Sequence, residues 1–441
     1  MSSAAPAASP SQVVSRPPSY RFVALGVVWC AYLIVFLSRL CVGPLAPFLK
    51  QSFDLSNAQI GGLTSATAVA YAPTLIFAGW LADRIGVRRA LIIGTLITGV
   101  CIGAVALAPS YGVMLLLLAC SGFGCGFIYP TAVKAIMVWF PARERATAVG
   151  VNQAAVNVSG MLGAAVMPAL ALAYSWRAGF VFAAGLAFAV CGIALVLYRD
   201  PGPAESPATP RVGASEDAPA AMYEIEQGLP GVTGDEQADR AALKPGFVAV
   251  ISSRDILLLG LAAMFLCMVE FAALAHLVLF LNVEWAYSVA AAAGLLALCQ
   301  AAGAFGKPLS GLVSDRLLGR RRRAPLMALA GLAGAACAIL ALLGPGHSWL
   351  LWTALLMLGV GAVGWGGLFG TLAGEIAGAA TAGAAAGVTA AIDNVGVFLG
   401  PPLFGLIVDR TGSYTPAWWA MVAAAGAAAC LLALVCEPRR G

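Results

Sequence analysis

Charge is scarce in this sequence: only 10% of the 441 residues are Asp, Glu, Lys or Arg, whereas 61% are hydrophobic. Soluble domains are about 45–50% apolar and about 25% charged. A chain with so little polar surface cannot cover its core in water, so lipid is its expected solvent. The sequence has only two histidines, which leaves no credible Ser-His-Asp triad. It has no C-x-x-C pair, which argues against a zinc site, and no Walker A sequence, which argues against an ATP site. We therefore expect no enzyme activity, no metal and no cofactor.

Twelve long apolar stretches occupy most of the chain. Each is long enough to cross a bilayer as a helix. Unpaired backbone groups are costly in hydrocarbon, so such a stretch is forced into helical structure. The predicted helices are 22–44, 58–82, 89–108, 112–139, 145–173, 178–198, 255–283, 287–312, 324–343, 348–374, 384–408 and 416–436.

The basic residues predict the orientation. When the amino end is counted as inside, 19 of the 25 Lys and Arg residues fall on the inner side. Three fall on the other side (Lys50, Arg177 and Arg410) and three lie within spans (Arg39, Lys134 and Lys307). The positive-inside rule then places both termini in the cytoplasm of a multi-pass inner-membrane protein. The net charge of +5 reflects this topology, and no nucleic-acid partner is expected.

Composition divides the chain into five parts. Residues 1–20 are rich in Ala, Ser and Pro and are expected to form a disordered cytoplasmic tail. A six-helix bundle is predicted over 21–198 and a second over 255–437, with a short cytoplasmic tail at 438–441. Between the bundles, 199–254 carries many prolines and acidic residues and is interpreted as a cytoplasmic linker.

Two internal repeats support the duplication. The turn G-W-L-A-D-R-I-G-V-R-R-A-L at Gly79–Leu91 recurs as G-L-V-S-D-R-L-L-G-R-R-R-R at Gly311–Arg323, 232 residues later. The segment Gly150–Gly163 likewise parallels Gly387–Gly400. Internal repeats of this kind occur in transporters. We therefore predict an all-α membrane protein with twelve transmembrane helices in two pseudo-symmetric six-helix bundles, whose task is to move a solute.

The repeated turn is a candidate gating element. A carboxylate and arginines at a helix junction can join helix ends by charge-assisted hydrogen bonds. Such a latch would stabilise the state in which the cytoplasmic side is closed; the alternative is that the arginines only anchor the topology. The residues concerned are Gly79, Asp83, Arg84, Gly86, Arg88 and Arg89 in the first copy and Gly311, Asp315 and Arg316 in the second.

The first copy resembles the signature of the major facilitator superfamily, G-x-x-x-D-R-x-G-x-R-R at Gly79–Arg89. This resemblance implies two six-helix bundles around a central path, with one midplane site exposed alternately to either side. The segments Arg39–Pro47 and Tyr129–Arg145 are similar to the organic-anion branches, which include phosphate-ester exchangers and anion–cation symporters. G-K-P-x-x-G at Gly306–Gly311 is similar to an element of monocarboxylate transporters.

The chain differs from the phosphate-ester exchangers in a way that changes which cargo is expected. In phosphate-ester exchangers the position of Arg39 supplies one of two arginines that hold a dianionic phosphate. The predicted helix 255–283 has no matching second arginine here; it offers Glu270 and His276 instead. A single strong cation suits a singly charged ligand better than a dianion.

Arg39 is the leading candidate for substrate binding. A charge within a span is costly, so it needs a reason. A guanidinium can hold a carboxylate through two parallel hydrogen bonds, and Tyr32 lies seven residues earlier on the same face. The alternative is a structural ion pair with Glu270 or Asp393. Further lining residues are expected to be Tyr71, Gln153, Asn157 and Asn394; for the amides, hydrogen bonding between helices is the alternative.

Glu270 and Asp393 are candidates for proton coupling. Burial raises the pKa of a carboxyl group and a nearby cation lowers it, so a balanced group can bind and release a proton. Glu270 is the first choice and Asp393 the second; a permanent salt bridge is the alternative. Lys134 and Lys307 are interpreted as structural residues or possible site residues, and Lys307 could pair with Asp393.

The sequence thus predicts a proton-coupled secondary transporter of a small organic anion, such as a monocarboxylate, in the inner membrane. Its expected partners are the lipid bilayer, a small anionic solute and protons, and it is expected to be monomeric. An organophosphate or inorganic-anion exchanger, an exporter of lipophilic compounds and a transporter-like sensor remain as alternatives.

Overall fold

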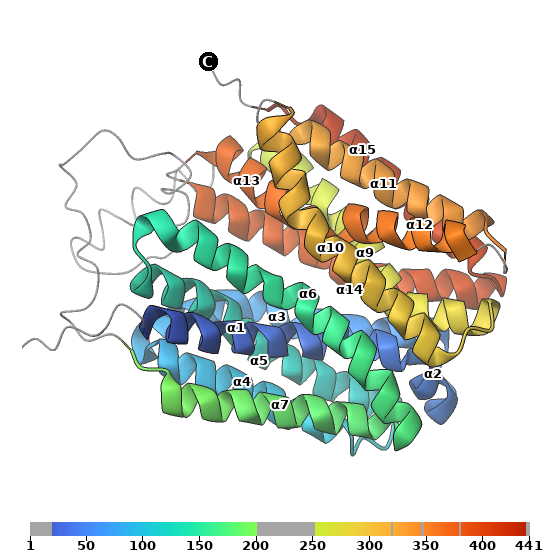
Figure 1. Cartoon of the computed structure of the whole chain (residues 1–441), viewed down its shortest axis with the longest axis horizontal. Helices are drawn as coiled ribbons and strands as arrows, with labels where there is room; N and C mark the ends of the chain where they lie inside the picture. Colours follow the sequence, from blue (N-terminus) through green and yellow to red (C-terminus); the bar gives the residue numbers. More distant parts are fainter. Residues whose placement is uncertain (1–19, 201–251, 319–320, 345–347, 379–380, 438–441) are drawn as a thin grey trace, which may run out of the picture.

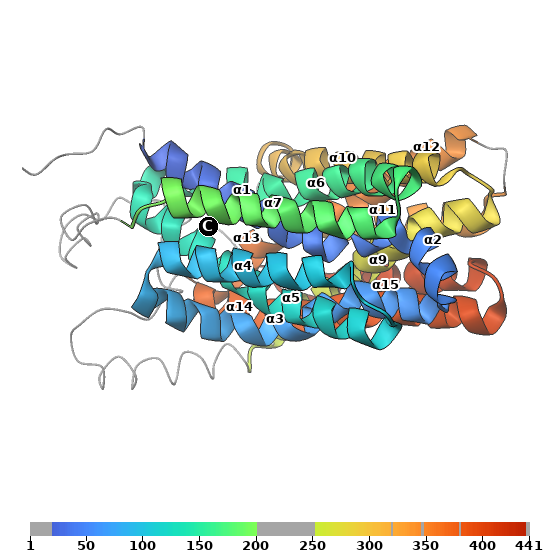
Figure 2. The ribbon, with the colours of Figure 1, turned by 90° about the horizontal axis from the view of Figure 1, so that it is seen from below.

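The computed structural model describes residues 20–200, 252–318, 321–344, 348–378 and 381–437, and the regular structure within them is helical. The helices lie side by side along the long axis of the molecule (Figures 1 and 2). In Figure 1 the helices of the first half form the lower group and those of the second half the upper group. The predicted tail over 1–20, apart from Tyr20, and almost all of the predicted linker lie outside the described residues.

Seven helices belong to the first half. They are α1 (Tyr20–Leu40), α2 (Val42–Phe53), α3 (Asn57–Ile85), α4 (Val87–Val105), α5 (Tyr111–Trp139), α6 (Ala142–Ala173) and α7 (Trp176–Leu197). The second half contains α9 (Arg254–Glu284), α10 (Val289–Arg316), α11 (Arg323–Leu342), α12 (Ser348–Leu358), the π-helical η2 (Gly359–Val363), α13 (Gly366–Ala377), α14 (Ala382–Thr411) and α15 (Thr415–Leu434).

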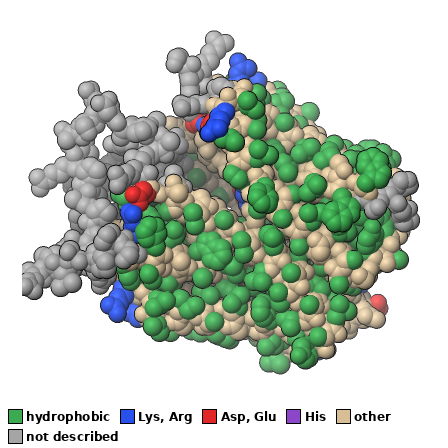
Figure 3. Space-filling view, viewed as in Figure 1, with side chains coloured by type: hydrophobic (Ala, Val, Ile, Leu, Met, Phe, Trp, Pro, Cys, Tyr) green, Lys and Arg blue, Asp and Glu red, His purple; other side chains and the backbone are tan. Residues whose placement is uncertain are grey.

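The molecule has the character of a multi-pass membrane protein. In the described part of the chain, eleven helical stretches are long and apolar enough to cross a bilayer, with α1–α2 and α12–α13 each counted once. The helix α3 is not among these eleven, although its 29 residues are long enough to span. Figure 3 shows a mostly hydrophobic surface, with charged side chains mainly towards the end where the grey segments lie.

The two ends of the molecule differ in charge. One end contains the junctions α3–α4, α5–α6 and α10–α11, which carry Arg88, Arg145, Arg316 and Arg322. We call it the basic end. The opposite end contains the junctions α2–α3, α9–α10 and α14–α15, and we call it the far end.

Two helices differ from the predicted continuous spans. The first span breaks at Cys41, between α1 and α2. Pro44 explains this break, because proline lacks the N–H that would bond to the carbonyl of Leu40 and its ring clashes with that carbonyl. The span predicted over 348–374 contains the π-helical η2, whose glycines pack closely against α10 and α11. Such π-helical segments are frequently found at functional sites.

Gly122 of α5 illustrates how the first bundle packs. A Cβ atom at this position would lie 2.1 Å from the carbonyl oxygen of Thr67 in α3. Small residues of this kind let membrane helices approach closely, so that dispersion contacts stabilise the pair.

We expect Gly122→Ala to lower the free energy of unfolding by about 1–3 kcal/mol, because the added methyl group forces α3 and α5 apart. The measurement is the thermal midpoint in detergent. Gly185→Ala in α7 is the matched control, since no atom lies within 4 Å of a Cβ built there. Equal midpoints for the two variants would contradict the close packing of α3 on α5.

Candidate functional site

Arg39 lies in the last turn of α1, just before the break at Cys41, and only 5% of its surface is exposed. Aromatic rings surround its guanidinium. The Cζ atom lies 4.4 Å from the ring centroid of Tyr71, 5.5 Å from that of Phe36 and 5.5 Å from that of Phe271. Cation–π attraction therefore holds the positive charge where the two halves meet.

The guanidinium of Arg39 forms no hydrogen bond among the described residues. Its Nε atom is buried and has no hydrogen-bond partner, and within the described ranges no ion pair joins Arg39 to Glu270 or Asp393. Both carboxyl groups are nevertheless near enough to feel its charge. A buried cation held by rings and not neutralised by a paired carboxylate is suited to bind an external anion.

Tyrosines extend this site through the first bundle. Tyr32, predicted on the same helix face as Arg39, is near enough to interact with its charge. Its ring packs on Phe36, 5.1 Å between centroids, and on Tyr129, 6.2 Å away. Tyr71 takes the place against the guanidinium. Tyr129 was not among the predicted site residues, yet 40% of its surface is exposed in the middle of an apolar helix. A Tyr-Pro pair inside an apolar stretch is the sequence signal that could have identified it.

The second bundle contributes the two carboxyl groups. The indole Nε1 of Trp365, at the start of α13, donates to Glu270 Oε2 at 3.3 Å and also to the carbonyl oxygen of Ala362 at 2.9 Å. Ala362 belongs to η2, so the π-helical segment places the indole against Glu270 of α9. Asp393 of α14 accepts a hydrogen bond from Asn394 Nδ2 at 3.1 Å.

The remaining candidates are spread around these groups. Lys307 of α10 is half-buried and interacts electrostatically with Glu270; no ion pair between Lys307 and Asp393 occurs in the described residues. Asn157 of α6 is buried, and its Oδ1 has no hydrogen-bond partner among the described residues. The Oδ1 atom of Asn394 in the second half also has no partner there, and neither does that of Asn152, a further buried residue of α6.

Three other predicted or considered residues lie in different surroundings. Gln153 of α6 is half-buried, one turn before Asn157. Lys134 Nζ donates to the carbonyl oxygen of Ala82 at 3.0 Å, which places it at the basic end of α3 and favours a structural role. His276 is fully buried, bonds to the carbonyl oxygen of Pro401 at 2.9 Å and stacks on Phe404, so it does not belong to the site around Arg39.

The first copy of the repeated turn lies at the α3–α4 junction. Gly79 and Asp83 belong to α3, and the side chain of Asp83 lies outside the described residues. Gly86 has φ +87°, a conformation that favours glycine, and it separates the two helices. The backbone N–H of Arg88 donates to Asp200 Oδ1 at 3.0 Å, and its side chain reaches the carbonyl oxygen of Leu195. Arg84 and Arg89 are exposed at this junction.

The second copy forms a cluster within the second bundle. Arg322 Nη1 lies 2.5 Å from Asp315 Oδ1, and its Nε lies 3.4 Å from Glu375 Oε1 of α13. Its backbone N–H donates to the carboxylate of Glu437. The arginine that pairs with Asp315 is thus Arg322, while the predicted Arg316 is exposed and Gly311 is half-buried. This cluster ties the end of α10 to α13.

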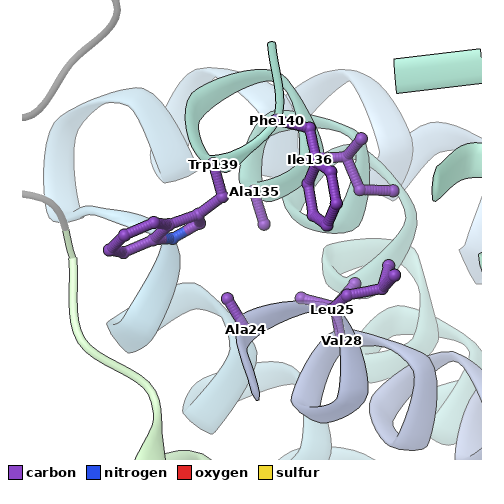
Figure 4. Close-up of a pocket in the computed structure, with 7 residues that line it drawn as sticks. All are labelled: Ala24, Leu25, Val28, Ala135, Ile136, Trp139 and Phe140. Atoms are coloured by element: carbon purple, nitrogen blue, oxygen red, sulfur yellow. The ribbon is translucent and has the colours of Figure 1, made fainter. Parts of the chain in front are cut away.

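A small apolar pocket lies between α1 and α5 at the basic end (Figure 4). Seven hydrophobic residues line it: Ala24, Leu25, Val28, Ala135, Ile136, Trp139 and Phe140. Ala24 precedes Arg39 by 15 residues, which is about 22 Å along a helix. The pocket is therefore separate from the site around Arg39. No group of His, Cys, Asp and Glu suited to hold a metal ion occurs in the part of the chain that the structure describes.

Comparison with known proteins yields one family and several relatives. A family profile described as Major Facilitator Superfamily matches residues 28–401. The chain is 32% identical over 161 residues to the probable sulfoacetate transporter SauU of Cupriavidus necator, which is 36% of this chain and 37% of that protein. It is 29% identical over 154 residues to the hexuronate transporter of Bacillus subtilis, covering 35% and 36%. The matches thus span little more than a third of these relatives.

A solved structure shows the same fold. The crystal structure of a bacterial homologue of the human lysosomal transporter Spinster, in an inward-facing and unoccupied conformation, superposes with a TM-score of 0.73. The sequence identity is 20%, and the match covers 95% of this chain and 98% of that one. At this identity the likeness concerns the fold alone.

Proposed function

Since the chain belongs to the major facilitator superfamily, we propose that it is a secondary transporter of a small organic anion, with twelve transmembrane helices arranged as two six-helix bundles. The observation that carries this proposal is the unpaired guanidinium of Arg39, buried where the halves meet. Relatives named for the transport of sulfoacetate and hexuronate support an anionic cargo. The positive-inside rule makes the basic end cytoplasmic in an inner membrane.

Charge balance supports proton coupling. The central region holds two basic groups, Arg39 and Lys307, and two acidic groups, Glu270 and Asp393. Binding a monocarboxylate to Arg39 would leave one excess negative charge in a medium of low dielectric constant, where charges interact strongly. A proton on Glu270 or Asp393 restores the balance. Anion and proton then favour each other's binding by reciprocal linkage, which is the basis of symport.

The binding roles follow from the geometry. Arg39 would hold the carboxylate, while Tyr32, Tyr71 and Tyr129 enclose its carbon skeleton. Asn157 and Asn394, whose Oδ1 atoms lack partners, would accept hydrogen bonds from hydroxyl groups on the cargo. Glu270 would carry the proton, with Asp393 as the second choice. The protein would act as a monomer, because both bundles of the proposed path belong to one chain.

The rival functions find less support. A phosphate-ester exchanger would need a second cation beside Arg39, but Lys307 has Glu270 as its charge partner. An exporter of lipophilic compounds would have no use for a buried guanidinium with free donors. A sensor would depend on the predicted linker, so its deletion should leave uptake intact if the protein is a carrier.

The test of this function is uptake into proteoliposomes. We expect labelled monocarboxylates, uronates or small sulfonates to accumulate when the lumen is alkaline, and to accumulate less when the pH gradient is collapsed. Protein-free liposomes give the background. Movement of lipophilic cations without movement of any anion would contradict the proposal and favour the exporter.

A further inference from the structure

The far end of α14 repeats the spacing of the signature turn. Gly405, Asp409, Arg410 and Gly412 follow the order G-x-x-x-D-R-x-G that also occurs at Gly79–Gly86. The helices α3 and α14 are packed together and antiparallel, since Asn57 at the start of α3 contacts Asp409 at the end of α14. One copy of the pattern therefore ends α3 at the basic end, and the other ends α14 at the far end.

Asp409 caps the first turn of α3 across the boundary between the halves. Its Oδ1 accepts from the backbone N–H and the Nδ2 of Asn57, and its Oδ2 accepts from the backbone N–H of Ala58, each at 2.8 Å. The first N–H groups of a helix have no partner within the helix, and a negative charge there is favoured by the helix dipole. The carboxylate meets both requirements.

The local sequence leaves these two donors free for Asp409. Ser56 and Gln59 form a capping box: Gln59 N–H donates to Ser56 Oγ at 3.2 Å, and Ser56 N–H donates to Gln59 Oε1 at 2.9 Å. The box satisfies Ser56 and Gln59 but not Asn57 and Ala58. The second half of the chain thus completes the cap that the first half leaves incomplete.

Close packing accompanies these hydrogen bonds. A Cβ atom at Gly405 would lie 2.2 Å from the carbonyl oxygen of Asn57, and one at Gly61 would lie 2.2 Å from that of Pro401. Lys50 Nζ donates to Asn57 Oδ1 at 2.8 Å, which fixes the side chain whose amide contacts Asp409. Glycine is required at both crossings, because any larger residue would separate α3 from α14.

We propose that the contact of Gly405 and Asp409 with the first turn of α3 is the outer latch of the carrier: it closes the far end in this conformation and releases when the far end opens. Asp409 is exposed, so water can replace it on Asn57 and Ala58 when the helices part. The latch is therefore reversible. This inference rests on the alternating access of the proposed transporter but not on the nature of the cargo.

The test is a pair of spin-label distances in the full-length protein without added solute. Labels at Leu107 and Glu284 report on the far end, and labels at Arg199 and Arg254 report on the basic end, in a background whose eleven free cysteines are replaced. We expect Asp409→Ala to raise the population with a long far-end distance about tenfold, since hydrogen bonds to a charged group are worth about 1.5–3 kcal/mol. The basic-end distance should shorten in the same population.

Two further variants make the result decisive. Gly405→Ala forces α14 from α3 without removing a charge, so it should produce the same shift. Arg410→Gln, at the exposed neighbouring position, is the control and should match the parent. Unchanged far-end distances in Asp409→Ala and Gly405→Ala overturn the latch. Broadening of both distance pairs in both variants also overturns it, because the contact would then serve only folding. A shift in a protein that moves no anion would leave the latch in place and remove the cargo assignment.

Discussion

Replacing Arg39 with alanine should reduce anion uptake by about 30-fold or more, because loss of a buried charge-assisted contact costs about 2–5 kcal/mol and each 1.4 kcal/mol is a factor of ten. Arg39→Lys keeps the charge but loses the two-pronged geometry, so its uptake should be intermediate. The measurement is the initial rate of uptake over a range of anion concentrations in proteoliposomes.

The same substitution should lower stability less than the loss of a salt-bridged arginine. Arg39 forms no salt bridge in the described residues, so its removal breaks none and relieves the cost of burying a charge. Its contacts with three aromatic rings are lost at the same time, as is its charge near Glu270 and Asp393. We expect the thermal midpoint of Arg39→Ala to lie below that of the parent but above that of Arg322→Ala, which breaks the salt bridges to Asp315 and Glu375.

Arg177 supplies the matched control for the uptake assay. Its Cζ atom lies 4.4 Å from the ring centroid of Trp176, which is the same distance as between Arg39 and Tyr71, but it is exposed at the far end of α7. Arg177→Ala should transport normally. If Arg39→Ala also transports acidic solutes at the parental rate, the cargo site lies elsewhere.

Glu270→Gln should separate transport from proton coupling. Glutamine has the shape of the protonated acid and still accepts the hydrogen bond from Trp365, so the fold and the anion site should persist. A symporter of one proton and one monoanion accumulates its cargo about tenfold per unit of pH difference, since each unit is worth 1.36 kcal/mol. We expect this accumulation to vanish while exchange of labelled for unlabelled anion continues.

The control and the second variant locate the proton. Glu284→Gln changes an exposed glutamate at the far end of the same helix and should leave accumulation intact. If Asp393→Asn abolishes accumulation while Glu270→Gln does not, Asp393 carries the proton. Coupling that survives both substitutions would remove both carboxyl groups from the mechanism.

The sequence predicted a helical membrane protein and made Arg39 the leading candidate for the substrate site. Apolar stretches predicted helices because hydrocarbon leaves the backbone no other way to pair its polar groups. Arg39 stood out because a guanidinium inside such a stretch is costly. These inferences depend on local composition and need no knowledge of which helices touch.

The surroundings of Arg39 depend on helix packing and could not be predicted in this way. Phe271 reaches the guanidinium from the other half of the chain, and periodicity does not reveal which faces of α1 and α9 meet. The bond of Trp365 to Glu270 could not be predicted either, because it depends on the π-helical turn that precedes the tryptophan. The pattern at Gly405–Gly412 was readable in the sequence, but its meaning required the contact of Asp409 with the first turn of α3.

The break between α1 and α2 has a consequence for inhibition. Arg39 sits one turn from the point where Pro44 interrupts the hydrogen-bonded ladder, so the proposed anchor for the cargo adjoins the break in its helix. We expect a rigid acid that binds Arg39 and is too bulky for the surroundings of Tyr71 and Phe271 to prevent the two halves from changing their relative positions. Such a compound would be an inhibitor that binds without being transported.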